Sequence, residues 1–90
     1  MVLCFPMANT STRLRPARFV ITAISPEPQK PENENYEIAT QLNDNSWTPS
    51  QGARGVSEIR SFLYGQGVGE NTISRAIEEL SRSRKTDVRV

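Results

Sequence analysis

Apolar residues recur at helical spacing near the end of the chain. Four of them stand at positions i, i+3, i+4 and i+7, namely Ile73, Ala76, Ile77 and Leu80. This spacing places an apolar stripe on one face of a helix, with polar residues on the other face. Gly69 and Asn71 precede the stripe as possible helix starters. The pattern therefore predicts a helix that ends near Leu80.

A second apolar pattern precedes it and consists of Val56, Ile59, Phe62 and Leu63. Their spacing predicts a shorter helix from about Ser57 to Tyr64, with Ser57 as its cap. Gly65 is expected to end this helix in a left-handed conformation. Two helices joined by a glycine-containing turn are therefore predicted.

Residues 36–47 fit two patterns. Tyr36, Ile38, Thr40 and Leu42 alternate with more polar or smaller residues, as in a half-buried strand. A short helix capped by Asn35 is also compatible, and we favour it because the downstream elements are helical. Asn43 to Ser46 form a turn by composition. Trp47 is expected to bury against the helices, and residues 48–51 to form one helical turn because they match a capping box.

The N-terminal part of the chain lacks such patterns. Residues 1–24 are rich in Arg, Ser and Thr and lack acids, which is typical of a chloroplast or mitochondrial transit peptide. Residues 20–23 offer a small-residue processing site, and Met1 or Met7 could be the start. The alternatives are an ordinary disordered N-terminus or a short strand from Arg18 to Ile24. Without a transit peptide, a cytoplasmic location is expected.

Residues 25–35 are predicted to be a disordered linker. Their three prolines oppose helix and sheet, and the segment is rich in charge. The residues after Arg84 are predicted to form a tail, 85–90, in which residues 87–90 are either a single strand or a frayed end. The expected fold is mainly α, a helical hairpin or three-helix unit over residues 36–84 behind a disordered N-terminal third. This division agrees with a hydrophobic content of only 36% in 90 residues.

Charge is unevenly distributed although the net charge is only +1. Residues 1–24 carry three arginines and no acid, residues 25–53 have a net charge of −4, and residues 54–90 a net charge of +2. This asymmetry suggests three zones with different roles.

The composition argues against several kinds of chemistry. Cys4 is the single cysteine and there is no histidine, which excludes a disulfide framework and Cys/His zinc sites. No apolar run approaches the about 18 residues of a membrane span. The glycines of residues 65–69 lack the lysine of a phosphate-binding loop. We therefore expect no enzyme activity and no cofactor.

The segment Gly67-Val68-Gly69-Glu70-Asn71-Thr72-Ile73-Ser74-Arg75 resembles the turn and recognition helix of LacI- and GntR-type helix-turn-helix regulators. The resemblance covers residues 56–84 and implies a DNA-binding module, regulatory or replication-associated. The residues assigned to nucleic-acid contact are Asn71, Thr72, Ser74, Arg75, Arg82, Arg84 and Lys85, with Arg89 as a further base of the tail. A monomer would bind weakly, so specific binding would require a homodimer.

The alternative function is that of a small organelle-targeted accessory protein that binds a protein partner. The apolar stripe of Ile73, Ile77 and Leu80 would then be the binding surface. Burial of this stripe between the two helices would favour DNA binding, whereas joint exposure of Ile73, Ile77, Phe62 and Trp47 would favour a protein partner.

Overall fold

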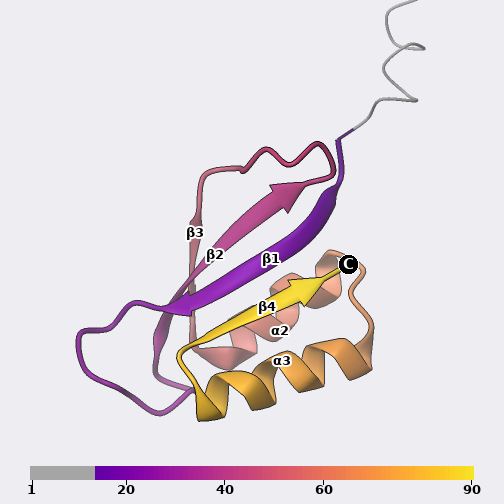
Figure 1. Ribbon diagram of the computed structural model, residues 1–90. Coiled ribbons are helices and arrows are strands. Elements are labelled where there is room, and N and C mark those ends of the chain that lie inside the picture. The colour runs from indigo at the N-terminus through magenta and orange to yellow at the C-terminus, as the bar shows by residue number, and fades with distance from the viewer. Residues whose placement is uncertain (1–13) are drawn as a thin grey trace, which may run out of the picture.

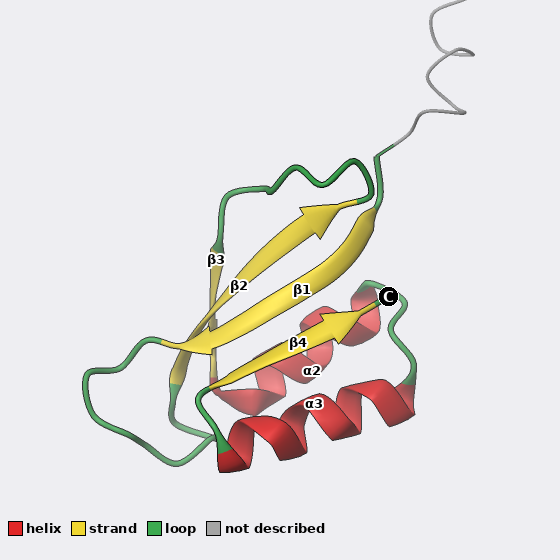
Figure 2. Ribbon diagram, in the orientation of Figure 1, coloured by secondary structure: helices red, strands yellow, loops and turns green. Residues whose placement is uncertain are grey.

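The computed structural model describes residues 14–90 and shows a four-stranded antiparallel sheet with two helices on one of its faces (Figures 1 and 2). The elements in chain order are β1 (Pro16–Ala23), β2 (Asn35–Leu42), β3 (Gln51–Arg54), α2 (Gly55–Gly65), α3 (Glu70–Arg82) and β4 (Lys85–Arg89).

The strand order is β3-β2-β1-β4, so β1 and β2 are central and β3 and β4 are the edges. β1 pairs with β2 on one side, with Ile21 opposite Ile38. On its other side β1 pairs with β4, with Phe19 opposite Val88. β1 therefore joins the end of the chain to the rest of the sheet.

Side chains alternate between the two faces of each strand. Phe19 and Ile21 of β1, Tyr36 and Ile38 of β2, and Val88 of β4 are buried on the helix side. Their neighbours Arg18, Thr22, Glu37 and Asp87 belong to the opposite, open face. One buried face and one open face are what the two-residue period of a strand produces in such a sheet.

The helices close the core with their apolar stripes. Ile59 and Leu63 of α2 and Ile73, Ala76 and Leu80 of α3 belong to the same buried cluster as the inward side chains of the strands. Phe62 packs edge-on against Phe19, with ring centroids 5.3 Å apart. Both predicted helices are thus confirmed, but each packs on a sheet.

The connection between α2 and α3 is a C-terminal glycine cap. The Val68 N–H donates to Leu63 O at 3.0 Å and the Gly67 N–H donates to Tyr64 O at 3.1 Å. Gly67 has φ +83°, so it supplies the left-handed residue that was predicted at Gly65. The helix therefore runs on to Gly65 before it stops.

The prediction of a mainly α fold is wrong. Three segments for which a leader, a helix and a tail were favoured form β1, β2 and β4. The strand that was the alternative in each of these segments is the one observed. A strand is stabilised by the strands that pair with it, and the two partners of β1, β2 and β4, lie far from each other in the sequence. Local patterns therefore do not predict these pairings. The predicted disordered N-terminal third therefore holds the strand that pairs with both β2 and β4.

Residues 43–51 also differ from expectation in part. The predicted turn after Leu42 is present, and Asn45 has a left-handed φ of 73°. Trp47 is 47% exposed, and its expected burial against the helices is wrong. Residues 48–50 are not helical, and Gln51 begins β3. No helix of the described residues is long and apolar enough to cross a membrane.

Candidate functional site

The apolar stripe of α3 packs into the core beneath the sheet. Ile73 and Leu80 are almost completely buried, and Ile77 is partly buried against the same cluster. In a helix-turn-helix unit this stripe would pack on the preceding helix of a helical domain. Here it lies in one buried cluster with the inward side chains of a four-stranded sheet, so the assignment to the LacI/GntR-type motif is wrong. The stripe is also not an exposed surface for a partner.

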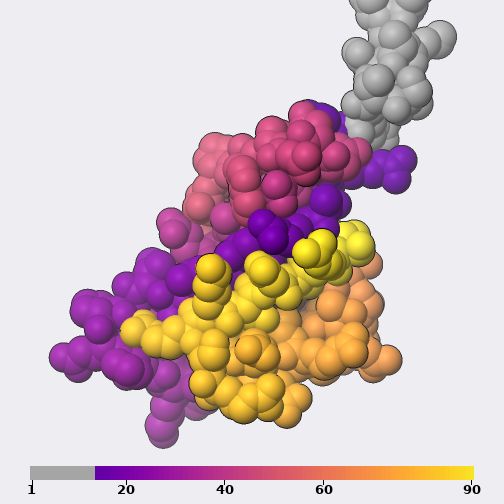
Figure 3. Space-filling model, viewed as in Figure 1, coloured from indigo at the N-terminus to yellow at the C-terminus, as the bar shows by residue number. Residues whose placement is uncertain are grey.

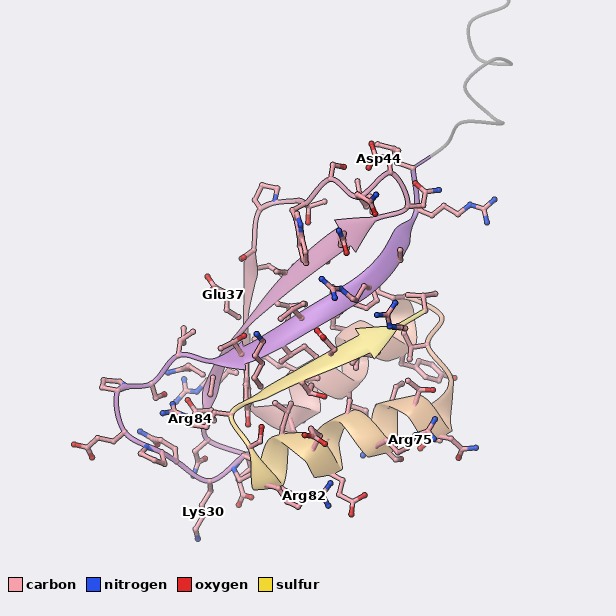
Figure 4. The ribbon with its side chains drawn as sticks, viewed as in Figure 1. Lys30, Glu37, Asp44, Arg75, Arg82 and Arg84 are labelled. Carbon is pink, nitrogen blue, oxygen red and sulfur yellow. The ribbon has the colours of Figure 1, made fainter. Side chains whose placement is uncertain are left out.

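The residues assigned to nucleic-acid contact are divided between the two ends of α3. Arg75 lies toward one end of the molecule and Arg82 and Arg84 toward the other (Figure 4). Asn71, Ser74 and Arg75 are exposed, whereas Thr72 is partly buried. α3 thus presents a polar outer face, but the structure does not gather these bases into one patch.

Two of the four assigned bases are paired with carboxylates. Arg82 contacts Glu78 at 3.3 Å and Glu79 at 3.6 Å. Arg84 lies 3.6 Å from Glu34 and donates to Ser25 O at 2.5 Å. Arg75 and Lys85 have no ion pair among residues 14–90. This pairing reduces the positive charge that the helix offers to phosphate.

Glu34 is a structural carboxylate at the end of the proline-rich loop. Its side chain is 3% exposed, and its Oε2 accepts a hydrogen bond from the Ser25 N–H at 3.1 Å. Hydrogen bonds from Ser25 and the charge of Arg84 lower the pKa of Glu34 against the opposing effect of burial. The contact ties the loop to the segment between α3 and β4.

The outer edge of β4 offers backbone groups that no other strand of the described sheet pairs with. The Ala23 N–H donates to Arg84 O and the Val90 N–H donates to Ala17 O, which places the even-numbered residues of this segment in hydrogen-bonded pairs with β1. Backbone groups alternate in direction along an antiparallel strand. The N–H and C=O groups of Lys85, Asp87 and Arg89 therefore point away from β1 toward the edge.

One of these three positions is already satisfied. The Lys85 N–H donates to Ser83 Oγ at 3.3 Å, and the Ser83 hydroxyl donates to Lys85 O at 3.0 Å. Asp87 and Arg89 have no such cap within the described chain. Each of them keeps an N–H and a C=O free for another strand.

α3 runs beside this edge and forms one wall of a groove. The groove has a volume of about 260 Å³ and is lined by Thr72, Arg75, Ala76 and Glu79 of α3 and by Thr86, Asp87, Val88 and Arg89 of β4. The α3 residues have the spacing i, i+3, i+4 and i+7, so they share one face. Figure 3 shows α3 in orange and β4 in yellow, side by side at the surface.

The open face next to the edge carries alternating charge. Lys85, Asp87 and Arg89 lie on it in succession along β4. Arg18 of the neighbouring strand lies 3.8 Å from Asp87, and its guanidinium stacks 5.3 Å from the ring centre of Trp47. A strand added at the edge would therefore meet an acid and a base two residues apart.

The opposite edge of the sheet is less accessible to a further strand. β3 has four residues, and the Gly55 N–H donates to Glu34 O at 2.7 Å. By alternation the backbone groups of Gly52 and Arg54 face outward, but the Arg54 N–H donates to Glu58 Oε1 at 2.7 Å. A groove of about 290 Å³ also lies at this edge, lined in part by Gly52, Arg54 and Glu58. Within residues 14–90, however, β4 is the edge strand with two successive outward positions whose N–H and C=O groups are both free.

The sequence predicts a tail over residues 85–90, with a strand at 87–90 as one alternative, but it does not predict that this strand pairs with β1 at a sheet edge. A signal was present, since Thr86 and Val88 alternate with Lys85, Asp87 and Arg89 in the pattern of a half-buried strand. An alternation over only five residues is a weak indication of a strand when the strand that pairs with it is not known. Comparison with models of protein families, with curated proteins and with solved structures finds no match to this chain.

Proposed function

We propose that this protein is an interaction module that binds an extended protein segment as an added strand beside β4. The observation that carries the proposal is the pair of free backbone positions at Asp87 and Arg89 next to the groove against α3. Strand addition to an exposed sheet edge is an established mode of recognition, in which main-chain hydrogen bonds supply affinity and flanking pockets supply specificity.

The dimensions of the groove favour a strand over a small molecule. Its volume of about 260 Å³ lies below the roughly 300 Å³ at which pockets for drug-sized ligands begin. Its walls include the small side chains of Thr72 and Ala76 beside Val88. The partner is again a protein, but it binds at the β4 edge of the sheet. The stripe of Ile73, Ile77 and Leu80, which the sequence predicted as the binding surface, lies in the core.

Nucleic-acid binding has weaker support. Arg75 and Lys85 are exposed cations without ion pairs among the described residues, but Arg82 and Arg84 are neutralised by neighbouring carboxylates. Affinity for nucleic acid depends on the number of phosphates that bases neutralise. The few unpaired bases therefore favour a protein segment over nucleic acid as the ligand.

The test uses the full chain and a phage-displayed library of random seven-residue peptides as the probe. Affinities of selected peptides are compared for the wild type, Arg89→Ala and Arg89→Pro. Both variants lose the same side chain, but only proline removes the outward N–H, and that N–H makes no bond to β1. We expect Arg89→Pro to bind the selected peptides about tenfold or more weakly than Arg89→Ala does. The circular dichroism spectra of both variants should match that of the wild type.

Methylation of single backbone nitrogens in the peptide provides the reciprocal control. Binding should be lost at alternate peptide positions only, because an added strand turns every second N–H toward β4. Selected peptides that bind both variants equally would contradict strand addition. Salt-sensitive binding of random duplex DNA that Arg75→Ala/Lys85→Ala loses, with no peptide selected, would instead support the nucleic-acid function.

A further inference from the structure

The two free positions of β4 carry opposite charges. Asp87 and Arg89 lie two residues apart, so both side chains project from the open face of the sheet. A strand that pairs with this edge in antiparallel orientation would place one residue opposite each of them. Opposite charges at directly facing positions stabilise an antiparallel pair, and like charges destabilise it. The best complement therefore reads acid, any residue, base.

The chain itself contains this complement, since Asp87-Val88-Arg89 has that order. A second copy that pairs about Val88 places Asp87 opposite Arg89 and Arg89 opposite Asp87. Each of these residues would exchange its free N–H and C=O with the residue that faces it. Val88 would face Val88 of the second copy on the helix side.

Other registers fit less well. Pairing about Asp87 would place Asp87 against itself and Lys85 against Arg89, so every facing pair on the open side would repel. It would also require the backbone groups of Lys85, which Ser83 already occupies. Pairing about Thr86 has the same requirement, although it places Lys85 opposite Asp87. The cap at Ser83 thus favours the register about Val88.

We infer that the strand accepted beside β4 is β4 of a second copy of this chain, in the antiparallel register centred on Val88. The inference rests on the proposed strand-docking edge and names its partner. The resulting homodimer has a two-fold axis at Val88, a continuous sheet across both copies, and α3 of each copy on the same face of that sheet. Dimerisation would cover the edge, so a foreign strand would have to compete with it.

The charges of Asp87 and Arg89 allow a test in which substitutions first disrupt and then restore the pairing between the β4 strands of the two copies. Asp87→Arg leaves two bases on the edge, and Arg89→Asp leaves two acids, so each variant repels its own copy. Each should weaken the dimer by about tenfold or more, because two facing pairs change from attractive to repulsive. Dissociation is measured by analytical ultracentrifugation of the full chain over a concentration series.

Two restored combinations separate this effect from misfolding. An equimolar mixture of the Asp87→Arg and Arg89→Asp chains should form a heterodimer, because each strand complements the other. The double variant Asp87→Arg/Arg89→Asp reverses the order of charges and should dimerise like the wild type. Arg89→Pro should be monomeric, and circular dichroism checks that all variants keep the sheet.

The outcomes also separate this inference from the proposed function. A wild type that stays monomeric at several hundred micromolar, or a dimer unaffected by the charge reversals and by Arg89→Pro, would overturn the inference. A monomer that still binds selected peptides in an Arg89→Pro-sensitive manner would leave strand docking intact with a foreign partner. A monomer for which no peptide is selected would contradict both.

Discussion

At the scale of single residues, Gly55 has a conformation that its position requires. It has φ +75° where β3 passes into α2, and a Cβ there would lie 2.4 Å from the carbonyl oxygen of Glu32. Both the backbone angle and the close approach of another main-chain atom exclude a side chain. The turn between the sheet and the first helix therefore depends on this glycine.

Gly55→Ala is expected to lower the free energy of unfolding by more than about 1 kcal/mol, because alanine is strained at positive φ and its Cβ collides with the backbone. Urea unfolding measures the change. Gly65→Ala is the matched control, since Gly65 lies in α2 and an added Cβ there would meet nothing within 4 Å apart from the adjoining backbone of its own helix. It should be neutral or stabilising, and an equal loss for both variants would refute the argument.

Glu34 gives the stability of the protein a specific dependence on pH. Its pKa is lowered below the ordinary value of 4.5 in the folded state. The ionised form is therefore favoured by folding, and its contribution is complete above about pH 4.5 and lost as the pH falls through the lowered pKa. Glu34→Gln should be less stable than the wild type at pH 7.

The difference in the free energy of unfolding between the wild type and Glu34→Gln should narrow progressively below pH 4.5, where Glu34 of the wild type takes up its proton. Thermal or urea unfolding at a series of pH values measures it, and the comparison cancels the titration of other carboxylates, including Asp44, whose pKa Ser46 also lowers. A difference that stays constant from pH 7 to pH 3 would show that the Glu34 charge does not stabilise the fold.

At the scale of elements, α3 shows what helical periodicity can and cannot predict. The spacing of Ile73, Ala76 and Leu80 correctly predicted a helix with one buried face. It did not reveal that the face packs on strands, because the same stripe suits a helix or a sheet as its partner. The turn chemistry before α3 was equally ambiguous, since a glycine-rich connection serves any pair of helices.

The strands show the complementary limit. β2 has clear alternation, yet its residues also fit a short helix, and the helical neighbours in sequence favoured the wrong choice. β4 has only five residues, too few for a pattern to be decisive. The sequence leaves residues 87–90 open between a strand and a frayed end. The effect of the charges of Asp87 and Arg89 on strand pairing depends on which way the backbone groups point, and the ladder with β1 determines that direction.

At the scale of the whole molecule, β1 holds the fold together. It lies between β2 and β4 and contributes Phe19 and Ile21 to the core. The predicted leader, 1–24, includes this strand. Cleavage within residues 20–23, at the predicted processing site, would cut through β1 and separate two strands that have no other contact in the sheet.

A chain of residues 25–90 is therefore expected to be largely unfolded, because it loses both ladders of β1 and two of its fully buried side chains. A chain of residues 14–90 retains every helix and strand that the structure describes and should fold like the full chain. Far-ultraviolet circular dichroism and thermal unfolding compare the two. Cooperative unfolding of residues 25–90 with native strand content would contradict the central role of β1.

By itself the sequence determined what depends on neighbours along the chain: the two helices, their buried faces, the turn after Leu42 and the absence of histidine and of paired cysteines. The tertiary structure decided what depends on distant residues. Pairing of β1 with β4 joins residues 18 and 89, and local propensity contains no information about that contact. The candidate site follows from the same pairing, because only the ladder with β1 determines which backbone groups of β4 remain free.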